Sequence, residues 1–252
     1  IERADCILIA GSNAAWAHPV LFRRIEDAKR LRSGVRVIVI DPRRTATAEI
    51  ADQHLAILPG TDVALFNGML HVLLWEEMSD AAFIEAHTEG FAALKATVRD
   101  YTPRFVAELC GIGEDEIVAA ARSFGRAKAA LSLYCMGLNQ SSHGTQKNAA
   151  LINLHLATGQ IARPGAGPFS LTGQPNAMGG REVGAMANLL VAHRDPSSAG
   201  DRAELARLWG VESKVCTKVL KHHTDKVLSV CRLQNGQFVK CSRNKTIIIW
   251  NN

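Results

Sequence analysis

Four short polar turns are the places in this sequence where chemistry is most easily positioned. Each follows an apolar run and contains glycine or a carboxylate: Gly11-Ser12-Asn13, Asp41-Pro42-Arg43, Pro59-Gly60-Thr61-Asp62 and Gly137-Leu138-Asn139-Gln140. Backbone N–H groups at a helix start after Asn13 can hold a pyrophosphate, and an acid such as Asp41 at a strand end can bond a ribose hydroxyl or a guanine edge. Turns also need Gly, Asp and Asn for purely structural reasons. Four such turns at one edge of a sheet nevertheless predict a dinucleotide-type site.

The elements that must position these turns alternate between strands and helices. Apolar runs predict strands at residues 5–10, 35–40, 54–58 and 130–137, and helical periodicity predicts helices at 63–75, 80–100 and 143–159 and others that begin at Pro19 and Glu114. We expect Thr61 or Asp62 to cap the helix over 63–75, and Gly34 to provide a left-handed cap after the first helix. The sequence therefore predicts an α/β fold with a Rossmann-like, doubly wound and mostly parallel sheet.

The last third of the chain has a different character. Residues 163–180 contain five Gly and three Pro, which predicts a long irregular segment of the kind that is usually functional or disordered. Residues 194–201 are typical of a linker, and a short helix is expected after them. Three short runs, "VLSVCR", "QFVKC" and "TIIIW", predict a three-stranded antiparallel meander at the C-terminus.

The net charge of +5 is concentrated in this C-terminal segment. Residues 213–252 carry eight Lys and Arg against one acid, whereas residues 1–212 carry 21 Lys and Arg against 23 Asp and Glu. A positive net charge confined to the C-terminal segment is not evidence of a nucleic-acid-binding surface, so we expect no nucleic-acid partner. The longest apolar runs fall short of the roughly 20 residues that span a bilayer, so we expect no membrane partner either.

Several motifs that would indicate other chemistry are absent from the sequence. Neither GxGxxG nor GxxxxGK[ST] occurs, which disfavours NAD(P) and P-loop sites, and without HExxH or GxSxG the hydrolase hypotheses have no support. The six cysteines include no CxxC pair, so we expect no metal ligands within the chain, a reducing compartment and a cytoplasmic location. His155 lies in an apolar helix and is predicted to be a core histidine.

Five separated segments resemble a known family, the molybdopterin guanine dinucleotide-dependent oxidoreductases. They are "LIAGSNAAWAHPVLFRRI", "VIDPRRTATAEIAD", "LPGTDVAL", "CMGLNQSSHGTQKNAALINLHLATGQI" and "FSLTGQPNAMGGREVG". The resemblance covers about residues 1–211, and the last two segments are most similar to the assimilatory nitrate reductase branch. Periplasmic nitrate reductases and formate dehydrogenases are the nearest other branches. The resemblance implies the central domains of the dimethyl sulfoxide reductase-type fold.

The resemblance also implies a cofactor, molybdenum bis-molybdopterin guanine dinucleotide, and a set of residues around it. The residues that would line one guanine dinucleotide, with Asp41 and Asp62 toward guanosine or ribose and Arg43 or Arg44 toward phosphate, are Gly11, Ser12, Asn13, Asp41, Pro42, Arg43, Arg44, Gly60, Thr61 and Asp62. Met136 and Gln140 would lie near the pterin. Gln174 and Asn176 would face the metal and substrate cavity, where Arg181 would stabilise an anion; a packing or surface salt bridge is an equal alternative for Arg181.

The activity implied by the resemblance is two-electron oxygen-atom transfer, which reduces nitrate to nitrite, with electrons from a donor protein or domain. By the same resemblance, the cysteines of a 4Fe-4S cluster and the molybdenum-ligating cysteine are expected upstream of residue 1, and a further cofactor-binding domain beyond residue 211. Cys135 is interpreted as a small apolar residue at a strand end instead of a metal ligand. This chain alone is expected to lack the parts for turnover.

Residues 218–252 resemble a single WD40 repeat, with His223 and Trp250 at two of its signature positions, although Asn244 and Asn251 replace the usual aspartates. One blade cannot bury both of its faces, since propellers have roughly 4 to 8 blades. We therefore expect three regions: a cofactor-binding region (1–192), a linker with a short helix (193–212) and a tail foreign to the family (213–252), from a junction artefact or a true fusion. The alternatives left open are a non-catalytic scaffold that uses this tail, and a formate dehydrogenase.

Overall fold

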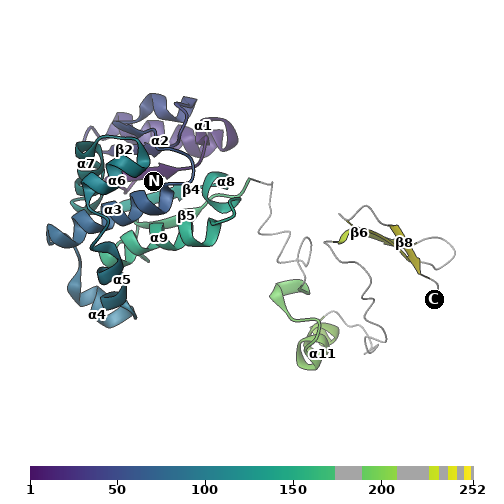
Figure 1. The fold of residues 1–252 in the computed structure, drawn as a ribbon. Coiled ribbons are helices and arrows are strands. Elements are labelled where there is room, and N and C mark those ends of the chain that lie inside the picture. The colour runs from purple at the N-terminus through teal and green to yellow at the C-terminus, as the bar shows by residue number, and fades with distance from the viewer. Residues whose placement is uncertain (174–188, 209–226, 233–237, 243–246, 251–252) are drawn as a thin grey trace. The chain divides into compact units, whose positions relative to one another are not determined.

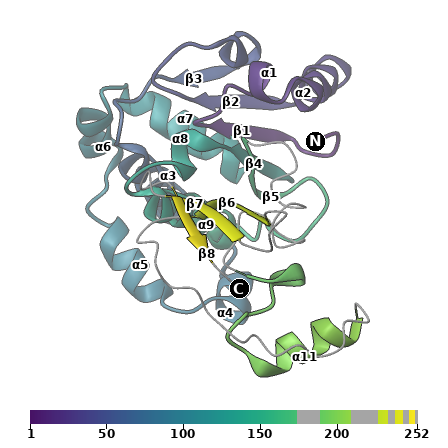
Figure 2. The same ribbon diagram turned by 90° about the vertical axis from the view of Figure 1, so that its right-hand side faces the viewer.

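The computed structural model describes residues 1–173, 189–208, 227–232, 238–242 and 247–250, which belong to two compact units, residues 1–173 and 174–252. The first unit contains a five-stranded sheet (Figure 1), with its strands in the order β3-β2-β1-β4-β5 (Figure 2). Its strands are β1 (Cys6–Ala10), β2 (Arg36–Ile40), β3 (Gln53–Leu55), β4 (Ala130–Tyr134) and β5 (Gly167–Ser170). Every pairing is parallel, which confirms the predicted α/β fold.

The register of the central strands brings the predicted turns together. Ala10, the last residue of β1, pairs with Ile40 of β2 on one side and with Tyr134 of β4 on the other, so the three strands end at the same level. The turns that follow them therefore meet at one edge of the sheet. This is where ligands bind in open parallel sheets.

Both faces of the sheet are covered by helices (Figure 2). One face packs Ile7, Ile9 and Val39 under α2 (Pro19–Leu31) and the 3-10 helix η1 (Ala46–Ile50). The other face packs Leu8 and Ile40 against a larger cluster formed by α3 (Asp62–Trp75), α6 (Pro103–Cys110), α7 (Glu114–Gly125) and α9 (Gly144–Ala157). Neighbouring residues of a strand point to opposite faces, so a strand buried on both sides is apolar throughout, as β1 is.

The remaining helices of the first unit are short. They are α1 (Ala14–Ala17), α4 (Ala81–His87), α5 (Phe91–Val98) and α8 (Met136–Asn139). The predicted helix over 80–100 is thus two helices, separated at Gly90, which has a left-handed φ of 75°. Among the described helices, none has both the length and the apolar composition needed to cross a membrane.

Three further local expectations differ from the structure. Helix α6 was not predicted, although Thr102 caps it by accepting from the Phe105 N–H at 3.3 Å and Gly111 ends it with a φ of 71°. Strand β5 lies within the segment predicted to be irregular; as an edge strand it can contain Pro168 without losing a bond that the sheet needs. Gly34 provides no left-handed cap, because α2 ends at Arg32 in an extended conformation.

The second unit contains the 3-10 helix η2 (Val191–His193), helix α11 (Ala199–Leu208) and strands β6 (Val227–Arg232), β7 (Phe238–Ser242) and β8 (Ile247–Trp250). The order β6-β7-β8 with antiparallel pairing confirms the predicted meander. Helix α11 confirms the short helix expected after the linker. The WD40 resemblance of this tail and its foreign origin stay predictions.

His155 is a core residue, as the sequence predicts. It is fully buried on α9 with Nδ1 2.8 Å from the carbonyl of Gln160 and Nε2 2.7 Å from the hydroxyl of Ser132, and its ring meets Phe124 edge-on. A carbonyl only accepts, so Nδ1 carries the proton and Nε2 accepts from Ser132. Burial lowers the pKa of His155 from 6.5 to about 4, against an opposing effect of the Gln160 carbonyl.

We expect acid to destabilise the first unit through this imidazole. Below pH 6.5 the unfolded chain binds a proton that folded His155 does not take until about pH 4, so stability is lost over that window. Between pH 7 and pH 5 the contribution is about 2 kcal/mol. In urea unfolding followed by circular dichroism, His155→Gln should lose less stability than the wild type between these two pH values. His87→Gln, at an exposed position, serves as the control and should keep the wild-type pH dependence. Equal pH dependence in His155→Gln and wild type would contradict the assignment.

Candidate functional site

A crevice of about 400 Å³ lies at the carboxyl ends of β1, β2 and β4. From β1 the chain adds β2 and β3 on one side of the sheet, and it then adds β4 and β5 on the other side of β1. The crevice therefore lies where the strand order reverses, which is the usual position of a ligand in this fold. Its walls come from the four polar turns and from α9. The lining residues are Gly11, Ser12, Asn13, Ala17, Ile40, Asp41, Pro42, Arg43, Ile57, Pro59, Gly60, Asp62, Cys135, Met136, Gly137 and Lys147.

Two glycines form the closest contact between the turns after β1 and β4. The Gly137 N–H donates to the carbonyl of Gly11 at 3.0 Å, and Gly11 has a left-handed φ of 55°. A Cβ added at Gly137 would lie 2.6 Å from the Cα of Gly11, which is backbone that cannot turn aside. Glycine at both positions therefore lets the two turns meet and form one side of the crevice.

Ser12 is the polar group in the crevice that most clearly lacks a partner. Its side chain is buried with 4% of its surface exposed, and its hydroxyl has no hydrogen-bond partner among the described residues. A buried hydroxyl without a partner costs free energy, so native proteins seldom keep one without a function or a bound molecule. Ser12 thus points to a ligand that accepts from, or donates to, this hydroxyl.

The helix start after Asn13 differs from the expected anion site. Helix α1 is a single turn, and the N–H of Ala15 is already bonded to the Thr47 hydroxyl at 3.0 Å, which in turn donates to the Asn13 side-chain oxygen at 3.0 Å. The longer helix α2 begins at Pro19, which has no N–H. Polar contacts at this loop therefore come from Ser12 instead of from a free helix end.

Asp41 is held in place by its own turn. Its carboxylate accepts from the Arg43 N–H at 2.9 Å through Oδ1, and its backbone carbonyl lies 2.9 Å from Nε2 of His54. The residue is 8% exposed, and Oδ2 stays available for a donor on a ligand. Arg43 is exposed at the rim of the crevice, whereas neighbouring Arg44 is exposed but does not line it.

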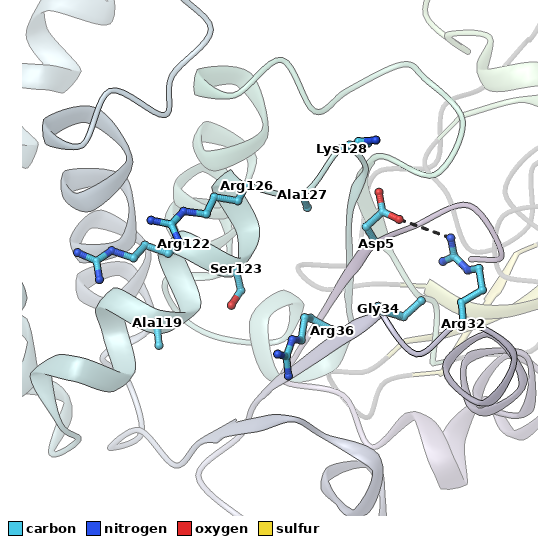
Figure 3. Close-up of a pocket in the computed structure, with 11 residues that line it drawn as sticks. Asp5, Arg32, Gly34, Arg36, Ala119, Arg122, Ser123, Arg126, Ala127 and Lys128 are labelled. Atoms are coloured by element: carbon cyan, nitrogen blue, oxygen red, sulfur yellow. Dashed lines mark hydrogen bonds and ion pairs between the residues drawn. The ribbon is translucent and has the colours of Figure 1, made fainter.

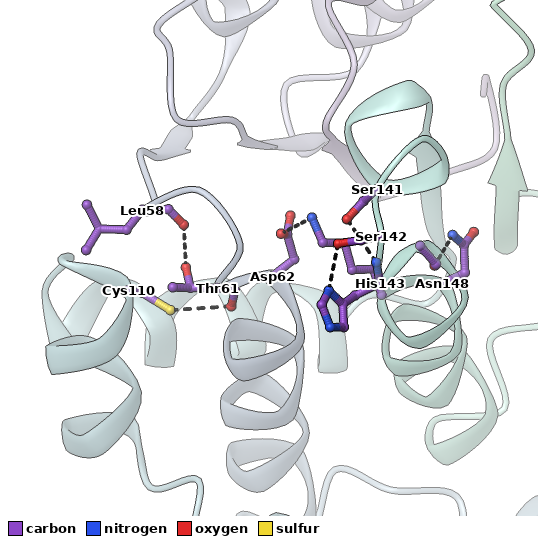
Figure 4. Close-up of polar contacts among 10 residues, drawn as sticks. Leu58, Thr61, Asp62, Cys110, Ser141, Ser142, His143 and Asn148 are labelled. Atoms are coloured by element: carbon purple, nitrogen blue, oxygen red, sulfur yellow. Dashed lines mark hydrogen bonds and ion pairs between the residues drawn. The ribbon is translucent and has the colours of Figure 1, made fainter.

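The turn before α3 presents Asp62 and turns Thr61 away. The Thr61 hydroxyl donates to the carbonyl of Leu58 at 2.7 Å instead of capping the helix, and the Cys110 thiol lies 3.8 Å from the Thr61 carbonyl (Figure 4). Burial raises the pKa of Cys110. Asp62, the first residue of α3, forms an ion pair of 2.7 Å with the Lys147 ammonium from α9.

Nine of the predicted cofactor residues are brought together in the crevice: Gly11, Ser12, Asn13, Asp41, Pro42, Arg43, Gly60, Asp62 and Met136. Three are not among its lining residues, namely Arg44, Thr61 and Gln140, which is exposed at the end of α8. The cavity residues Gln174, Asn176 and Arg181 lie outside the described residues. The assignments of these residues to a cofactor stay predictions.

Lys147 is the charged crevice residue that sequence reasoning missed. It lies on a helix whose other buried residues are apolar except for His155, and a charge on such a helix was the signal that could have found it. Cys135 also lines the crevice; it is 2% exposed and sits between β4 and α8. The described residues include no group of three or more His, Cys, Asp and Glu able to hold a metal ion.

The chain beyond β5 returns to the crevice. The Leu171 N–H donates to the carbonyl of Tyr134 at 2.6 Å, and the Thr172 carbonyl lies 2.8 Å from Nε2 of His18. A Cβ on Gly173 would lie 2.7 Å from the sulfur of Met136, a lining residue. Gly173, the last described residue of the first unit, therefore lies beside the crevice.

A second, larger cavity of about 740 Å³ lies at the opposite edge of the sheet, near the amino ends of β1 and β2 (Figure 3). Its lining contains Arg32, Arg36, Arg122, Arg126 and Lys128. Three of these cations have carboxylate partners in Asp5, Asp52 and Glu76, at 3.5, 3.7 and 2.8 Å respectively. It lies away from the turns at the carboxyl ends of the strands, so its size does not make it the candidate site.

The sequence model of the family described as Molybdopterin oxidoreductase matches residues 1–248. The chain belongs to the molybdopterin oxidoreductase family. Similar curated relatives include a nitrate reductase of Synechocystis sp. (46% identity, 84% of this chain, 30% of the relative), a periplasmic nitrate reductase of Desulfovibrio desulfuricans (47%, 84%, 29%) and an F420-dependent formate dehydrogenase subunit alpha of Methanocaldococcus jannaschii (44%, 77%, 28%).

A solved structure of the same fold agrees with this membership. Acetylene hydratase from Pelobacter acetylenicus superposes with a TM-score of 0.59 at 32% identity, over 65% of this chain and 22% of the hydratase. The chain spans about 30% of the length of the curated relatives it matches. Membership of this family implies that the whole protein binds a molybdenum-pterin cofactor.

We expect Gly137→Ala to destabilise this molybdopterin oxidoreductase by roughly 1 to 3 kcal/mol, because the added methyl group forces the turns after β1 and β4 apart. Urea unfolding followed by circular dichroism measures the loss. Gly34→Ala is the matched control, since a Cβ there meets nothing within 4 Å, and it should leave stability nearly unchanged. If both variants are as stable as the wild type, the glycine contact does not hold the turns together.

Proposed function

We propose that this chain is the guanine dinucleotide-binding part of a molybdenum nitrate reductase. The observation that carries the site assignment is the buried Ser12 hydroxyl without a partner among the described residues, in a crevice at the sheet's reversal point. Family membership supports the pterin cofactor, and similarity to nitrate reductases at 46% and 47% identity supports the substrate. The whole protein would take electrons from a donor protein or domain.

The chemistry of the crevice fits a guanine dinucleotide. Its charged lining residues are two carboxylates, Asp41 and Asp62, and two cations, Arg43 and Lys147. A carboxylate accepts well from the adjacent ring and amino N–H groups of guanine or from ribose hydroxyls, and cations bind phosphate oxygens. The small residues Gly11 and Gly137 allow close approach of the backbone to such a ligand.

The crevice residues act by binding and orientation. Asp41 Oδ2 would accept from guanosine, Ser12 would bond the sugar or pyrophosphate, and the turns after β1 and β4 would exclude water from one side of the nucleotide. The molybdenum group, when bound, supplies two-electron oxygen-atom transfer from nitrate. Placing the nucleotide firmly would fix the pterin end near Met136, which lines the crevice.

We expect Ser12→Ala to weaken binding of guanosine diphosphate (GDP) roughly tenfold without loss of stability. A hydrogen bond to a charged group contributes about 1.5 kcal/mol, whereas removal of an unpaired buried hydroxyl is neutral or stabilising. Calorimetric titration of the 252-residue chain with GDP, together with urea unfolding, tests both halves. The wild type should bind GDP more tightly than adenosine diphosphate, because adenine lacks the adjacent donors that a carboxylate recognises.

Thr47→Val provides the stability control for this experiment. Thr47 is fully buried and bonded to both Ala15 and Asn13, so this variant should lose about 1 to 3 kcal/mol. Absence of GDP binding by the wild type, or equal binding of the adenine nucleotide, would overturn the guanine dinucleotide assignment. GDP affinity unchanged in Ser12→Ala would remove the hydroxyl from the site.

The nitrate assignment is tested in a chimera. We expect the Synechocystis nitrate reductase to keep nitrate reduction with reduced methyl viologen when its matching segment is replaced by that of this chain, because both segments would place the same cofactor. Molybdenum content per protein, compared with the parent enzyme, reports cofactor loading separately. A chimera that holds molybdenum as the parent does but reduces no nitrate would contradict the proposed substrate, and formate oxidation by it would favour the formate dehydrogenase branch.

A further inference from the structure

We propose that Lys147 is a phosphate-binding residue of the crevice and that Asp62 holds it in place until a ligand separates the pair. The inference rests on the proposed function and deepens it, since the phosphate would be that of the guanine dinucleotide. In the closed pair, each charge neutralises the other. In the bound state, Lys147 would contact phosphate oxygens and the Asp62 carboxylate would accept from the nucleoside.

The pair is buried and faces the crevice. Lys147 Nζ lies 2.7 Å from Asp62 Oδ2, with 8% and 13% of the two side chains exposed, and both residues line the cavity. Lys147 comes from the first turns of α9 and Asp62 from the first residue of α3. Two helices that pack side by side thus place opposite charges at the wall of one cavity.

Packing explains the contact of α3 with α9 without this pair. Leu65 and Phe66 of α3 and Leu151 and Leu154 of α9 are fully buried in the same apolar cluster. A buried ion pair adds little net stability over apolar residues, because desolvation of both charges offsets their attraction. The pair is therefore poorly explained as a clamp between helices.

Hydrogen-bond capacity also favours a ligand. An ammonium has three donors, and Asp62 is the only acceptor that the described residues provide for Lys147. The Ser12 hydroxyl, which lines the same cavity, lacks a partner among the described residues as well. Two unsatisfied donor groups on the wall of one crevice match a ligand rich in acceptor oxygens, as a diphosphate is.

Charge balance points to the same residue. The lining carries Asp41 and Asp62 against Arg43 and Lys147, so the crevice is neutral before a ligand enters. A diphosphate brings further negative charge beside the two carboxylates. Arg43 is exposed and screened by solvent, whereas Lys147 is buried, where its charge acts with less screening. Lys147 is thus the cation with the stronger effect on a bound phosphate.

The test compares GDP with guanosine, which lacks phosphate. Calorimetric titration of the 252-residue chain should show that Lys147→Met weakens GDP binding roughly tenfold, the scale of one charge-assisted hydrogen bond, and leaves guanosine binding unchanged or tighter. Lys147→Arg keeps the charge and should retain most of the GDP affinity. Equal losses for GDP and guanosine would show a structural role and overturn the proposal, as would no loss for either.

Lys29→Met is the matched control. Lys29 forms an ion pair of the same length, 2.7 Å, with Asp52, and neither residue lines the crevice, so GDP binding should be unaffected.

If Lys147→Met does not fold, the double variant Asp62→Asn/Lys147→Met is used instead, because it leaves no uncompensated buried charge. It should still bind GDP at least tenfold more weakly than the wild type, and wild-type GDP affinity in this double variant would overturn the proposal. No GDP binding by the wild type overturns both this inference and the proposed function, whereas unchanged binding in Lys147→Met overturns this inference alone.

Discussion

The contact between the Gly11 and Gly137 turns is the constraint on which the crevice depends. A parallel sheet aligns the ends of β1 and β4, but only residues without a Cβ let the following turns come within hydrogen-bonding distance, with N to O at 3.0 Å. This contact positions Ser12 and Asn13 on one side and Cys135 and Met136 on the other. The doubly wound core holds the strands; the glycine pair determines the shape of the space above them.

Electrostatics in this space are balanced internally. Asp41 is partly satisfied by its own turn, Asp62 by Lys147 and Asn13 by Thr47, whereas Ser12 has no partner among the described residues. Because most of these polar groups have a partner, burying them costs little free energy. They can still exchange that partner for a ligand that forms stronger hydrogen bonds. Family membership implies a molybdenum-pterin cofactor in the whole protein, and we propose that its guanine dinucleotide occupies this edge of the sheet.

The large basic cavity near β1 and β2 illustrates why size alone is a poor guide to function. Its guanidinium groups are largely engaged with Asp5, Asp52 and Glu76, and no polar turn from the carboxyl ends of the strands reaches it. The smaller crevice joins the four polar turns with α9. Chemistry in an open parallel sheet follows the strand ends, where helix starts and turns converge.

The sequence by itself determined the alternating elements, the parallel sheet, the turns at the strand ends and the core position of His155, because these follow from local periodicity and residue type. Segment motifs also indicated the family. Tertiary structure alone decided that β5 pairs at the edge, that Arg44 and Thr61 do not line the crevice, and that the Ala15 N–H is occupied by Thr47. It also brought Lys147 to Asp62, from separate helices. Contacts of this kind arise from how α3 and α9 pack on a shared face, and no local pattern encodes which distant side chains then meet.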